Sequence, residues 1–278
     1  MKKQIIADSC CDLSEALKAK MDIVEVPLTI RANGKLYVDD ETLDTLELIA
    51  EMKSSQEPPS TSCPSPDDFI KSYDAEKDSF VVTLSSELSG TYNSAVLAKQ
   101  IFQEEHKESF IHVFNSKSAS VGETMISLKL QELINKGLEN SEVVEQTEAY
   151  IEEMKTYFIL ESLDNLIKAG RISRFKGKLA SLLSIVPIMK ATDAGEIDLS
   201  EKVRGAKKAF GRLVEIIGEQ GSSFEEKILG IAHCNCFEKA LKLKSEIERA
   251  YNFKEIVIVE TQGISTVYAN DGGIVIAF

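Results

Sequence analysis

The first half of the chain alternates short apolar runs with longer segments of helical periodicity. Apolar runs of this kind, bounded by polar turns, are typical of buried strands, whereas apolar residues at every third or fourth position indicate amphipathic helices. The predicted strands cover 3–7, 24–30, 79–84 and 110–114. The predicted helices cover 14–20, 45–54, 67–74, 90–103, 120–136 and 141–155. This alternation predicts a parallel sheet covered by helices on both faces.

The pattern changes near residue 157, where strand-like segments become more frequent. Strands are predicted at 157–160, 185–191, 196–199, 227–233, 255–260 and 274–278. Thr192-Asp193-Ala194-Gly195 separates two of them and is typical of a hairpin turn. We therefore predict an α/β protein with two domains, a parallel-sheet α/β/α domain over 1–156 and a mixed-sheet α/β domain over 157–278.

The composition agrees with a soluble globular protein. Of 278 residues, 43% are hydrophobic and 28% are charged, and no apolar run approaches the roughly 18 residues that a membrane-spanning helix needs. The first residues turn polar too soon for a signal peptide, so a cytoplasmic location is expected. Five cysteines without regular spacing indicate reduced thiols rather than a disulfide framework.

The charge is unevenly distributed along the chain. The net charge of −13 argues against nucleic acid as a partner, because phosphate contacts need clustered Lys and Arg. Residues 165–212, however, include eleven Lys and Arg but only four Asp and Glu. This basic window is either a solvated helix face or a surface that docks an anion or an acidic partner.

Three segments rich in hydroxyl side chains are candidates for a ligand site. They cover 60–66, 85–94 and 115–120, and the second and third follow predicted strands. Loops at the carboxyl ends of parallel strands line one crevice, and the start of a helix attracts anions. For one such loop, helix capping by Ser or Thr is the favoured explanation. Three loops at one sheet edge predict instead a site for a small anionic group.

The residues offer little support for catalysis or metal binding. A serine nucleophile needs a base, and the chain has only His106, His112 and His233, without a nucleophile-elbow pattern. The sequence His233-Cys234-Asn235-Cys236 lacks a second cluster to complete a tetrahedral metal site. No P-loop or Rossmann glycine pattern is present. We therefore expect no catalytic residue, no metal and no nucleotide bound by this chain.

Three segments resemble the signature segments of the DegV family, in the same order and with the same spacing over essentially the whole chain. They read Thr61-Ser62-Cys63-Pro64-Ser65-Pro66, Ser89-Gly90-Thr91-Tyr92-Asn93-Ser94-Ala95 and Gly170-Arg171-Ile172-Ser173. The opening Asp8-Ser9 also fits, as does the Asn115-Ser116-Lys117 turn, with Asn where the family usually has Asp.

The resemblance implies a bacterial lipid-binding protein that is not itself an enzyme. A long-chain fatty acid would lie in a tunnel between the two domains and would be the only bound small molecule, with no cofactor. The chain would be the binding subunit of a fatty acid kinase, and a separate ATP-binding subunit would phosphorylate the carboxylate. Lipid exchange would involve peripheral contact with a membrane.

The resemblance also assigns roles to individual residues. The fatty-acid carboxylate would be held by Thr61, Ser62, Ser89 and Gly90. Arg171 and Arg204, both inside the basic window, would contact the kinase partner or the phosphate, a task that suits the planar guanidinium. Where the family usually has His-x-Gly-Pro-Gly, this chain has Tyr268-Ala269-Asn270-Asp271-Gly272. Tyr268 would therefore replace the family histidine beside the carboxylate.

Two other functions use the same loops. One is a phosphate-ester-binding phosphotransferase, and the other is an acyl hydrolase with Ser89 or Ser62 as nucleophile. A fatty acid fits the remaining sequence because its tunnel needs only apolar side chains, and each buried CH₂ contributes about 0.8 kcal/mol. The segment 179–189 carries no charged residue and could supply such a wall, although ordinary core packing explains it equally well.

Overall fold

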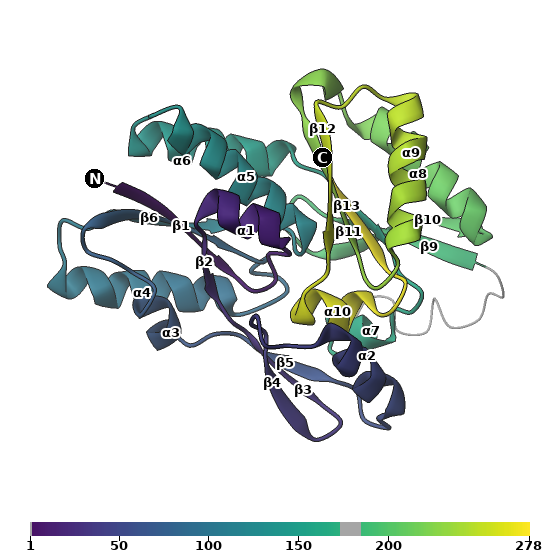
Figure 1. Ribbon diagram of the computed structural model, residues 1–278, viewed down its shortest axis with the longest axis horizontal. Coiled ribbons are helices and arrows are strands. Elements are labelled where there is room, and N and C mark those ends of the chain that lie inside the picture. Colours follow the sequence, from purple (N-terminus) through teal and green to yellow (C-terminus); the bar gives the residue numbers. More distant parts are fainter. Residues whose placement is uncertain (1, 173–184) are drawn as a thin grey trace.

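The computed structural model describes residues 2–172 and 185–278 and contains three β-sheets (Figure 1). A four-stranded sheet and a six-stranded sheet lie side by side, and a small three-stranded sheet lies below them in the view of Figure 1. Across the described ranges, no helix is both long and apolar enough to cross a membrane. The α/β class predicted from the sequence is confirmed.

The four-stranded sheet, here called sheet A, is parallel throughout, with the order β2-β1-β6-β7. Its strands are β1 (Lys2–Asp8), β2 (Val24–Val26), β6 (Lys77–Thr83) and β7 (Ile111–Asn115). One face is covered by α1 (Glu15–Met21), α5 (Val121–Asn135) and α6 (Asn140–Glu153), and the other by α3 (Pro66–Ile70) and α4 (Thr91–Glu105). Alternate strand residues enter the two cores: Ile5 faces α5, whereas Ile6 faces α4.

The six-stranded sheet, sheet C, is mixed, with the order β10-β9-β8-β13-β11-β12. Its strands are β8 (Thr156–Ile159), β9 (Ile185–Ala191), β10 (Ile197–Arg204), β11 (Ile228–His233), β12 (Glu255–Glu260) and β13 (Ile274–Ala277). The predicted hairpin is confirmed, because β9 and β10 pair antiparallel around the turn at 192–196. The helices α8 (Ala206–Gln220) and α9 (Phe237–Ala250) pack on one face. The 3₁₀ turn Phe224–Glu226 precedes β11.

Helix α5 joins the two large sheets. Its residues Ile126, Leu130 and Leu133 pack on sheet A, whereas Val121 and Met125 pack on sheet C. The close approach to sheet C depends on Gly230 in β11, since a Cβ there would lie 2.4 Å from Val121 Cγ2. Both large sheets are therefore fixed relative to the start of α5, the region next to the candidate site.

The third sheet corrects two predictions. The run 24–30, predicted as one strand, divides into β2 in sheet A and β3 (Thr29–Ala32) in the small sheet, sheet B. The start of the predicted loop 60–66 is the edge strand β5 (Ser60–Ser62), because the free side of β3 pairs with it. The strand β4 (Lys35–Val38) completes sheet B, and α2 (Thr45–Ser54) packs beside it. The helix predicted at 67–74 ends earlier, at Ile70.

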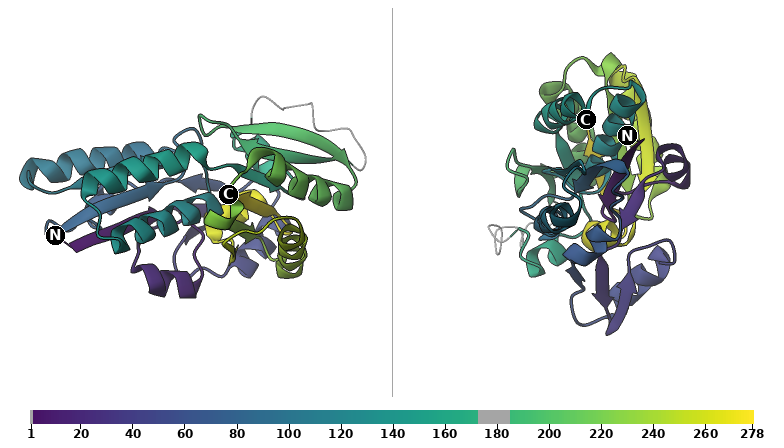
Figure 2. Two further views of the ribbon diagram at one scale, coloured as in Figure 1. Left: turned by 90° about the horizontal axis from the view of Figure 1, so that it is seen from above. Right: turned by 90° about the vertical axis from the view of Figure 1, so that its left-hand side faces the viewer.

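Two short helices complete the fold between the sheets. These are α7 (Asp164–Lys168) and α10 (Gly263–Ala269), which contact each other, and α10 also contacts α2 and β3. Figure 2 shows sheets A and C lying along the longest axis, with sheet B projecting to one side. Helix α10 thus lies where all three sheets come together.

Candidate ligand-binding site

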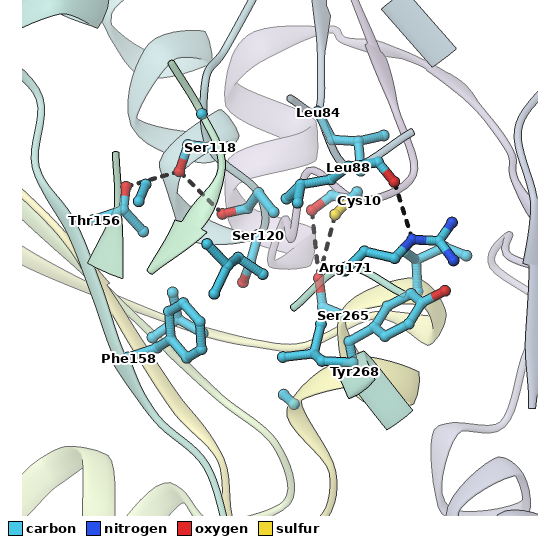
Figure 3. Close-up of a pocket in the computed structure, with 18 of the residues that line it drawn as sticks. Cys10, Leu84, Leu88, Ser118, Ser120, Thr156, Phe158, Arg171, Ser265 and Tyr268 are labelled. Atoms are coloured by element: carbon cyan, nitrogen blue, oxygen red, sulfur yellow. Dashed lines mark hydrogen bonds between the residues drawn. The ribbon is translucent and has the colours of Figure 1, made fainter. Parts of the chain in front are cut away.

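A cavity of about 110 Å³ opens where the carboxyl ends of β1, β6 and β7 meet sheet C (Figure 3). The segments after these strands contribute Cys10, Leu84, Leu88, Ser118, Ala119 and Ser120. Sheet C and its hairpin contribute Thr156, Phe158, Leu160, Ala191, Gly195, Ile197 and Val275, and the α7 and α10 regions contribute Leu166, Arg171, Ile264, Ser265, Tyr268 and Ala269. In sheet A, β1 lies between β2 and β6, so the cavity lies at the switch in strand order where ligands of open sheets bind.

The interior of the cavity is predominantly apolar. The few hydroxyls inside it are paired with protein groups: Ser118 Oγ lies 2.7 Å from Thr156 Oγ1, and Ser265 Oγ lies 3.8 Å from Cys10 Sγ (Figure 3). Paired hydroxyls have less hydrogen-bonding capacity to offer a ligand. The interior therefore suits an apolar chain, and a polar head group must find its partners at the edge.

Among the predicted site residues, Arg171 and Tyr268 line this cavity. Thr61, Ser89 and Gly90 are not among the described lining residues, but Thr61 contacts Tyr268, and Ser89 and Gly90 follow the lining residue Leu88. We call these five residues the rim. The Tyr268 hydroxyl, from α10, lies 2.7 Å from Thr61 Oγ1, from β5. The Arg171 guanidinium carbon lies 5.6 Å from the centroid of the Tyr268 ring, and Figure 3 shows these two side chains beside each other. Two hydroxyls beside a guanidinium offer hydrogen-bond donors and one positive charge, which is what a carboxylate or phosphate requires.

Arg171 is held in place by backbone carbonyls. Its Nε donates to Leu88 O at 3.1 Å and its Nη1 donates to Ala169 O at 2.9 Å. Leu88 belongs to the segment that follows β6, so this bond ties the segment after α7 to the hydroxyl-rich loop of sheet A. The guanidinium has five N–H donors, and these two bonds use only part of that capacity.

Ser89 and Gly90 form the other part of the rim, at the start of α4. Ser89 Oγ lies 2.8 Å from Thr91 Oγ1, and Gly90 caps the helix without a side-chain hydrogen bond. A Cβ on Gly90 would lie 3.4 Å from Cys63 Sγ, so the segment that follows β5 passes directly beside this helix start. The fifteen-residue helix directs free N–H groups and a partial positive charge toward this point.

The predicted site residues differ in where the structure places them. It brings together Thr61, Tyr268 and Arg171. Gly90 lies close to Cys63, two residues after Thr61, so the start of α4 is near this group. Ser62 is exposed, and since side chains alternate along a strand, it points away from the face on which Thr61 meets Tyr268. Arg204 ends β10, is exposed, and is not among the described lining residues.

No histidine supports the hydrolase hypothesis. His106 is exposed and stacks on Phe102, with 4.4 Å between ring centroids, and His112 lies 3.2 Å from Glu148. His112 is half-buried. His233 is buried, its pKa is lowered by burial, and its Nδ1 accepts from Cys236 N. None of the three is a described lining residue of the cavity.

The second half of the 233–236 motif likewise has local partners. Cys234 Sγ lies 3.8 Å from Thr266 Oγ1, and Cys236 Sγ lies 3.5 Å from Gly273 O. Both thiols act as donors to oxygen, and burial raises the pKa of both. The segment is a strand end with one buried thiol, Cys234, and one half-buried thiol, Cys236.

Two buried carboxyl groups, which the sequence did not single out, position α10. Asp39 Oδ1 accepts from Gly263 N at 2.7 Å and Oδ2 accepts from Ile264 N at 2.9 Å, while Asp12 Oδ1 accepts from Gln262 N at 2.7 Å. Burial raises the pKa of Asp39 to about 6 and that of Asp12 to about 7. The helix that they fix carries Ser265 and Tyr268, so these acids set the geometry of the cavity wall.

Part of the predicted wall and of the predicted signature lies outside the described residues. Ser173, the end of the Gly-Arg-Ile-Ser segment, falls there, as do Arg174, Lys176 and Lys178 of the basic window and 179–184 of the apolar segment. The remainder of that segment belongs to β9, of which Ala191 at its end lines the cavity.

Fold and site together define a class, an α/β protein of two large sheets and one small sheet, with an apolar cavity beside hydroxyl and guanidinium groups. The chain belongs to the DegV family. The family model, whose description is an uncharacterised protein of the DegV family, matches residues 2–278. A DegV domain-containing protein of Streptococcus pneumoniae (strain ATCC BAA-255 / R6) is 35% identical over 280 residues, covering 100% of this chain and 99% of the relative.

Solved structures of similar proteins contain fatty acids. A DegV family protein from Ruminococcus gnavus, described with vaccenic acid, superposes with a TM-score of 0.95 at 44% identity and covers 100% of this chain and 99% of its own. The Streptococcus pneumoniae Fatty Acid Kinase (Fak) B3 protein, loaded with linoleic acid, has a TM-score of 0.91 at 35% identity, with coverage of 100% and 99%. A protein from Eubacterium eligens loaded with heptadecanoic acid has a TM-score of 0.91 at 30% identity, with coverage of 99% and 98%.

Proposed function

We propose that this protein binds one long-chain fatty acid, with the acyl chain in the cavity and the carboxylate at the rim. The observation that carries the proposal is the pairing of an apolar interior with the Thr61–Tyr268 hydroxyl pair beside Arg171. The two hydroxyls and the N–H groups at the start of α4 donate to the carboxylate. The fatty acids in the similar structures support this ligand class.

The energetics favour a long chain. At about 0.8 kcal/mol for each buried CH₂, a sixteen-carbon chain contributes on the order of 10 kcal/mol before the costs of ordering are subtracted. The cavity of about 110 Å³ is smaller than the pockets of about 300–1,000 Å³ that hold drug-sized ligands. We therefore expect lining side chains to move apart as the acyl chain enters.

The carboxylate contacts need not be equal. Thr61 and Tyr268 already face each other. A carboxylate oxygen between them would accept a hydrogen bond from each hydroxyl, in place of the bond between the two hydroxyls. Ser89 and Gly90 add a hydroxyl and a helix start. Ser62 remains a proposed contact, and it would reach the ligand only if β5 rotates or the carboxylate projects beyond the rim.

We further propose that the protein presents the carboxylate to a separate kinase subunit and has no catalytic residue of its own. Arg171 lies at the rim, where a phosphate added to the carboxylate would emerge, and Arg204 is exposed on β10 for contact with the partner. The relative described as a Fatty Acid Kinase B3 protein supports this role. In this proposal, ATP is bound by the partner.

We also propose the division into domains at 1–156 and 157–278. The cavity supports it, because one side of the lining comes from the segments after β1, β6 and β7 and the other from sheet C and α10. The boundary falls at the first residue of β8, Thr156, which itself lines the cavity and hydrogen-bonds to Ser118 across it.

Mass spectrometry of the purified protein tests the ligand. The mass of the native complex is measured, the protein is then denatured, and the molecules that it releases are extracted and identified. We expect about one fatty acid per chain, and the doubly substituted variant Thr61→Val/Tyr268→Phe should retain less of it. Tyr37→Phe is the matched control, since the Tyr37 hydroxyl lies in sheet B without a hydrogen-bond partner among the described residues. Binding of phosphate esters instead, with no fatty acid, contradicts the proposal.

A reconstituted reaction tests presentation to a kinase. With an ATP-binding fatty acid kinase subunit, ATP and loaded protein, we expect acyl phosphate to form. Arg171→Ala should abolish this product while fatty acid remains bound, and Arg204→Ala should reduce it. If Arg171→Ala releases the fatty acid, Arg171 is a carboxylate ligand and its proposed role toward phosphate is wrong.

A further inference from the structure

Beneath the cavity, three buried side chains come together, of which only Cys10 also lines the cavity. They are Asp8 at the end of β1, Cys10 in the turn that follows, and Glu123 in the first turn of α5. Their side-chain ligand atoms all lie within 4.8 Å of one another, and each residue is at most 3% exposed. One thiol and two carboxyl groups thus converge on one point inside the protein.

Glu123 is the least expected member of this group. It is fully buried, and among the residues that the structure describes its carboxyl oxygens interact with no polar group other than Asp8 and Cys10. Asp8 differs, since its two oxygens accept from Cys10 N at 2.9 Å and from Leu84 N at 2.8 Å. The polar groups that Glu123 faces are Asp8 and Cys10 themselves.

The charges around Glu123 make the arrangement costly unless something compensates them. Burial is the main cause that raises the pKa of Glu123 well above the usual range, and the neighbouring acids Asp8 and Asp12 raise it further. Burying a carboxylate without a partner is strongly unfavourable, and a polar group without a hydrogen bond also loses free energy. A positive charge at the centre of the group would satisfy Glu123 and offset the repulsion.

The donor set indicates which cation fits. A thiolate with two carboxylates is a borderline combination that suits Zn²⁺ and chemically similar divalent ions, whereas Ca²⁺ and Mg²⁺ prefer oxygen ligands alone. Cys10 lies on the cavity wall (Figure 3), so the cavity gives a path to the group and room for a water as fourth ligand.

We propose that Asp8, Cys10 and Glu123 form a binding site for one divalent cation of the zinc class. The site is separate from the fatty-acid rim and does not depend on the proposed function. The cation ties the turn after β1 to the start of α5, the helix that packs on both large sheets. On binding, the Cys10 thiol and protonated carboxyl groups release their protons, so affinity falls as the pH is lowered.

Spectroscopy with Co²⁺ in place of Zn²⁺ tests the site in the full chain. The protein is freed of metal with a chelator and titrated with Co²⁺, and Zn²⁺ affinity is then measured by competition with a chromophoric chelator. We expect one cation per chain, with the charge-transfer absorption that a cobalt–thiolate bond produces. Glu123→Gln, which keeps the side-chain size, should weaken Zn²⁺ binding at least tenfold, and Cys10→Ser should abolish the thiolate absorption.

Matched controls separate this site from the other thiols. Cys11→Ser changes an equally buried neighbour whose Sγ lies 3.6 Å from Ser127 Oγ, outside the proposed site, and Cys236→Ser changes the other candidate segment. Both should bind Co²⁺ like the unmodified protein. The proposal is overturned if folded protein binds no Co²⁺, if binding lacks the thiolate absorption, or if Cys236→Ser rather than Cys10→Ser removes it. It is also overturned if Glu123→Gln leaves Zn²⁺ affinity unchanged.

Discussion

The rim of the cavity and the buried anchors of α10 use polar groups in opposite ways. At the rim, Thr61 and Tyr268 are half-buried and bonded only to each other, so a ligand can replace that bond. Asp39 and Asp12 are buried and committed to backbone N–H groups at the start of α10. The groups proposed to bind a ligand are thus paired only with each other's hydroxyls, whereas Asp39 and Asp12 fix the helix that carries Tyr268.

Removing an anchor should have the largest effect. Asp39→Ala leaves the N–H groups of Gly263 and Ile264 without their acceptors inside the protein, so we expect a loss of about 3 kcal/mol in the free energy of unfolding. Urea unfolding measures it. Asp40→Ala is the control, because the carboxyl group of this exposed neighbour accepts from Thr42 and not from α10. Equal effects at both positions would show that Asp39 does not anchor α10.

The anchor should also make stability depend on pH. Burial raises the pKa of Asp39 from 3.8 to about 6, so the folded protein holds this proton when the unfolded chain has lost it. The stabilising contribution of the protonated form is complete below about pH 4 and is lost as the pH rises through about 6. Relative to Asp39→Asn, the free energy of unfolding should fall by on the order of 2–3 kcal/mol across this window.

The measurement is urea unfolding of both proteins at several pH values, since the difference cancels other titrating groups. A carboxyl group stabilised by an ion pair would show the opposite change, with a free energy of unfolding that rises with pH. A difference that rises with pH, or that stays constant between pH 4 and pH 6, would show that Asp39 is not held at a raised pKa.

A substitution at the rim should have a smaller effect, and it should lower fatty-acid affinity rather than the free energy of unfolding. Tyr268→Phe removes one hydroxyl donor but retains the ring beside Arg171, so fatty-acid affinity should fall by about 1 kcal/mol, roughly fivefold. Displacement of a fluorescent fatty acid measures it, with Tyr37→Phe as control. Unfolding in urea should change little. If the free energy of unfolding falls as much as in Asp39→Ala, the rim hydroxyl stabilises the fold as strongly as the buried anchor does, which contradicts the comparison.

Ser62 should show the smallest effect. It is exposed and points away from the Thr61–Tyr268 pair, so Ser62→Ala should change fatty-acid affinity by less than about 0.5 kcal/mol, while Thr61→Val should cost about as much as Tyr268→Phe. The same displacement assay compares them. A larger loss for Ser62→Ala would mean that β5 presents its other face to the bound ligand.

The regular parts of the fold were predictable because their signals are local. Sheet A and its helices follow from apolar runs and helical periodicity, and the β9–β10 hairpin follows from its turn residues. Helices α8, α9 and α10 were not predicted, although α8 and α9 each have an apolar stripe that packs on sheet C. The strands of sheet B were mistaken for loop or merged with β2, because short strands acquire their identity from pairing.

Some residues of the candidate site could likewise be predicted from the sequence, and others could not. The hydroxyl-rich segments, Arg171 and the Tyr268 substitution stand out in the sequence, because their residue types and spacing are visible along the chain. The anchors do not, since a lone aspartate in a turn resembles any other. Asp39 and Gly263 are more than 200 positions apart, and only folding shows that one accepts from the other.

The sequence by itself determined the alternation of strands and helices, the family and the polar segments that we propose as the ligand site. These are recorded in periodicity and motifs, which depend on neighbours along the chain. Only the tertiary structure decided that Thr61 faces Tyr268 while Ser62 does not, and that Asp8, Cys10 and Glu123 share one buried point. Those facts depend on strand pairing and on α5 packing between two sheets, and such long-range contacts leave no local pattern.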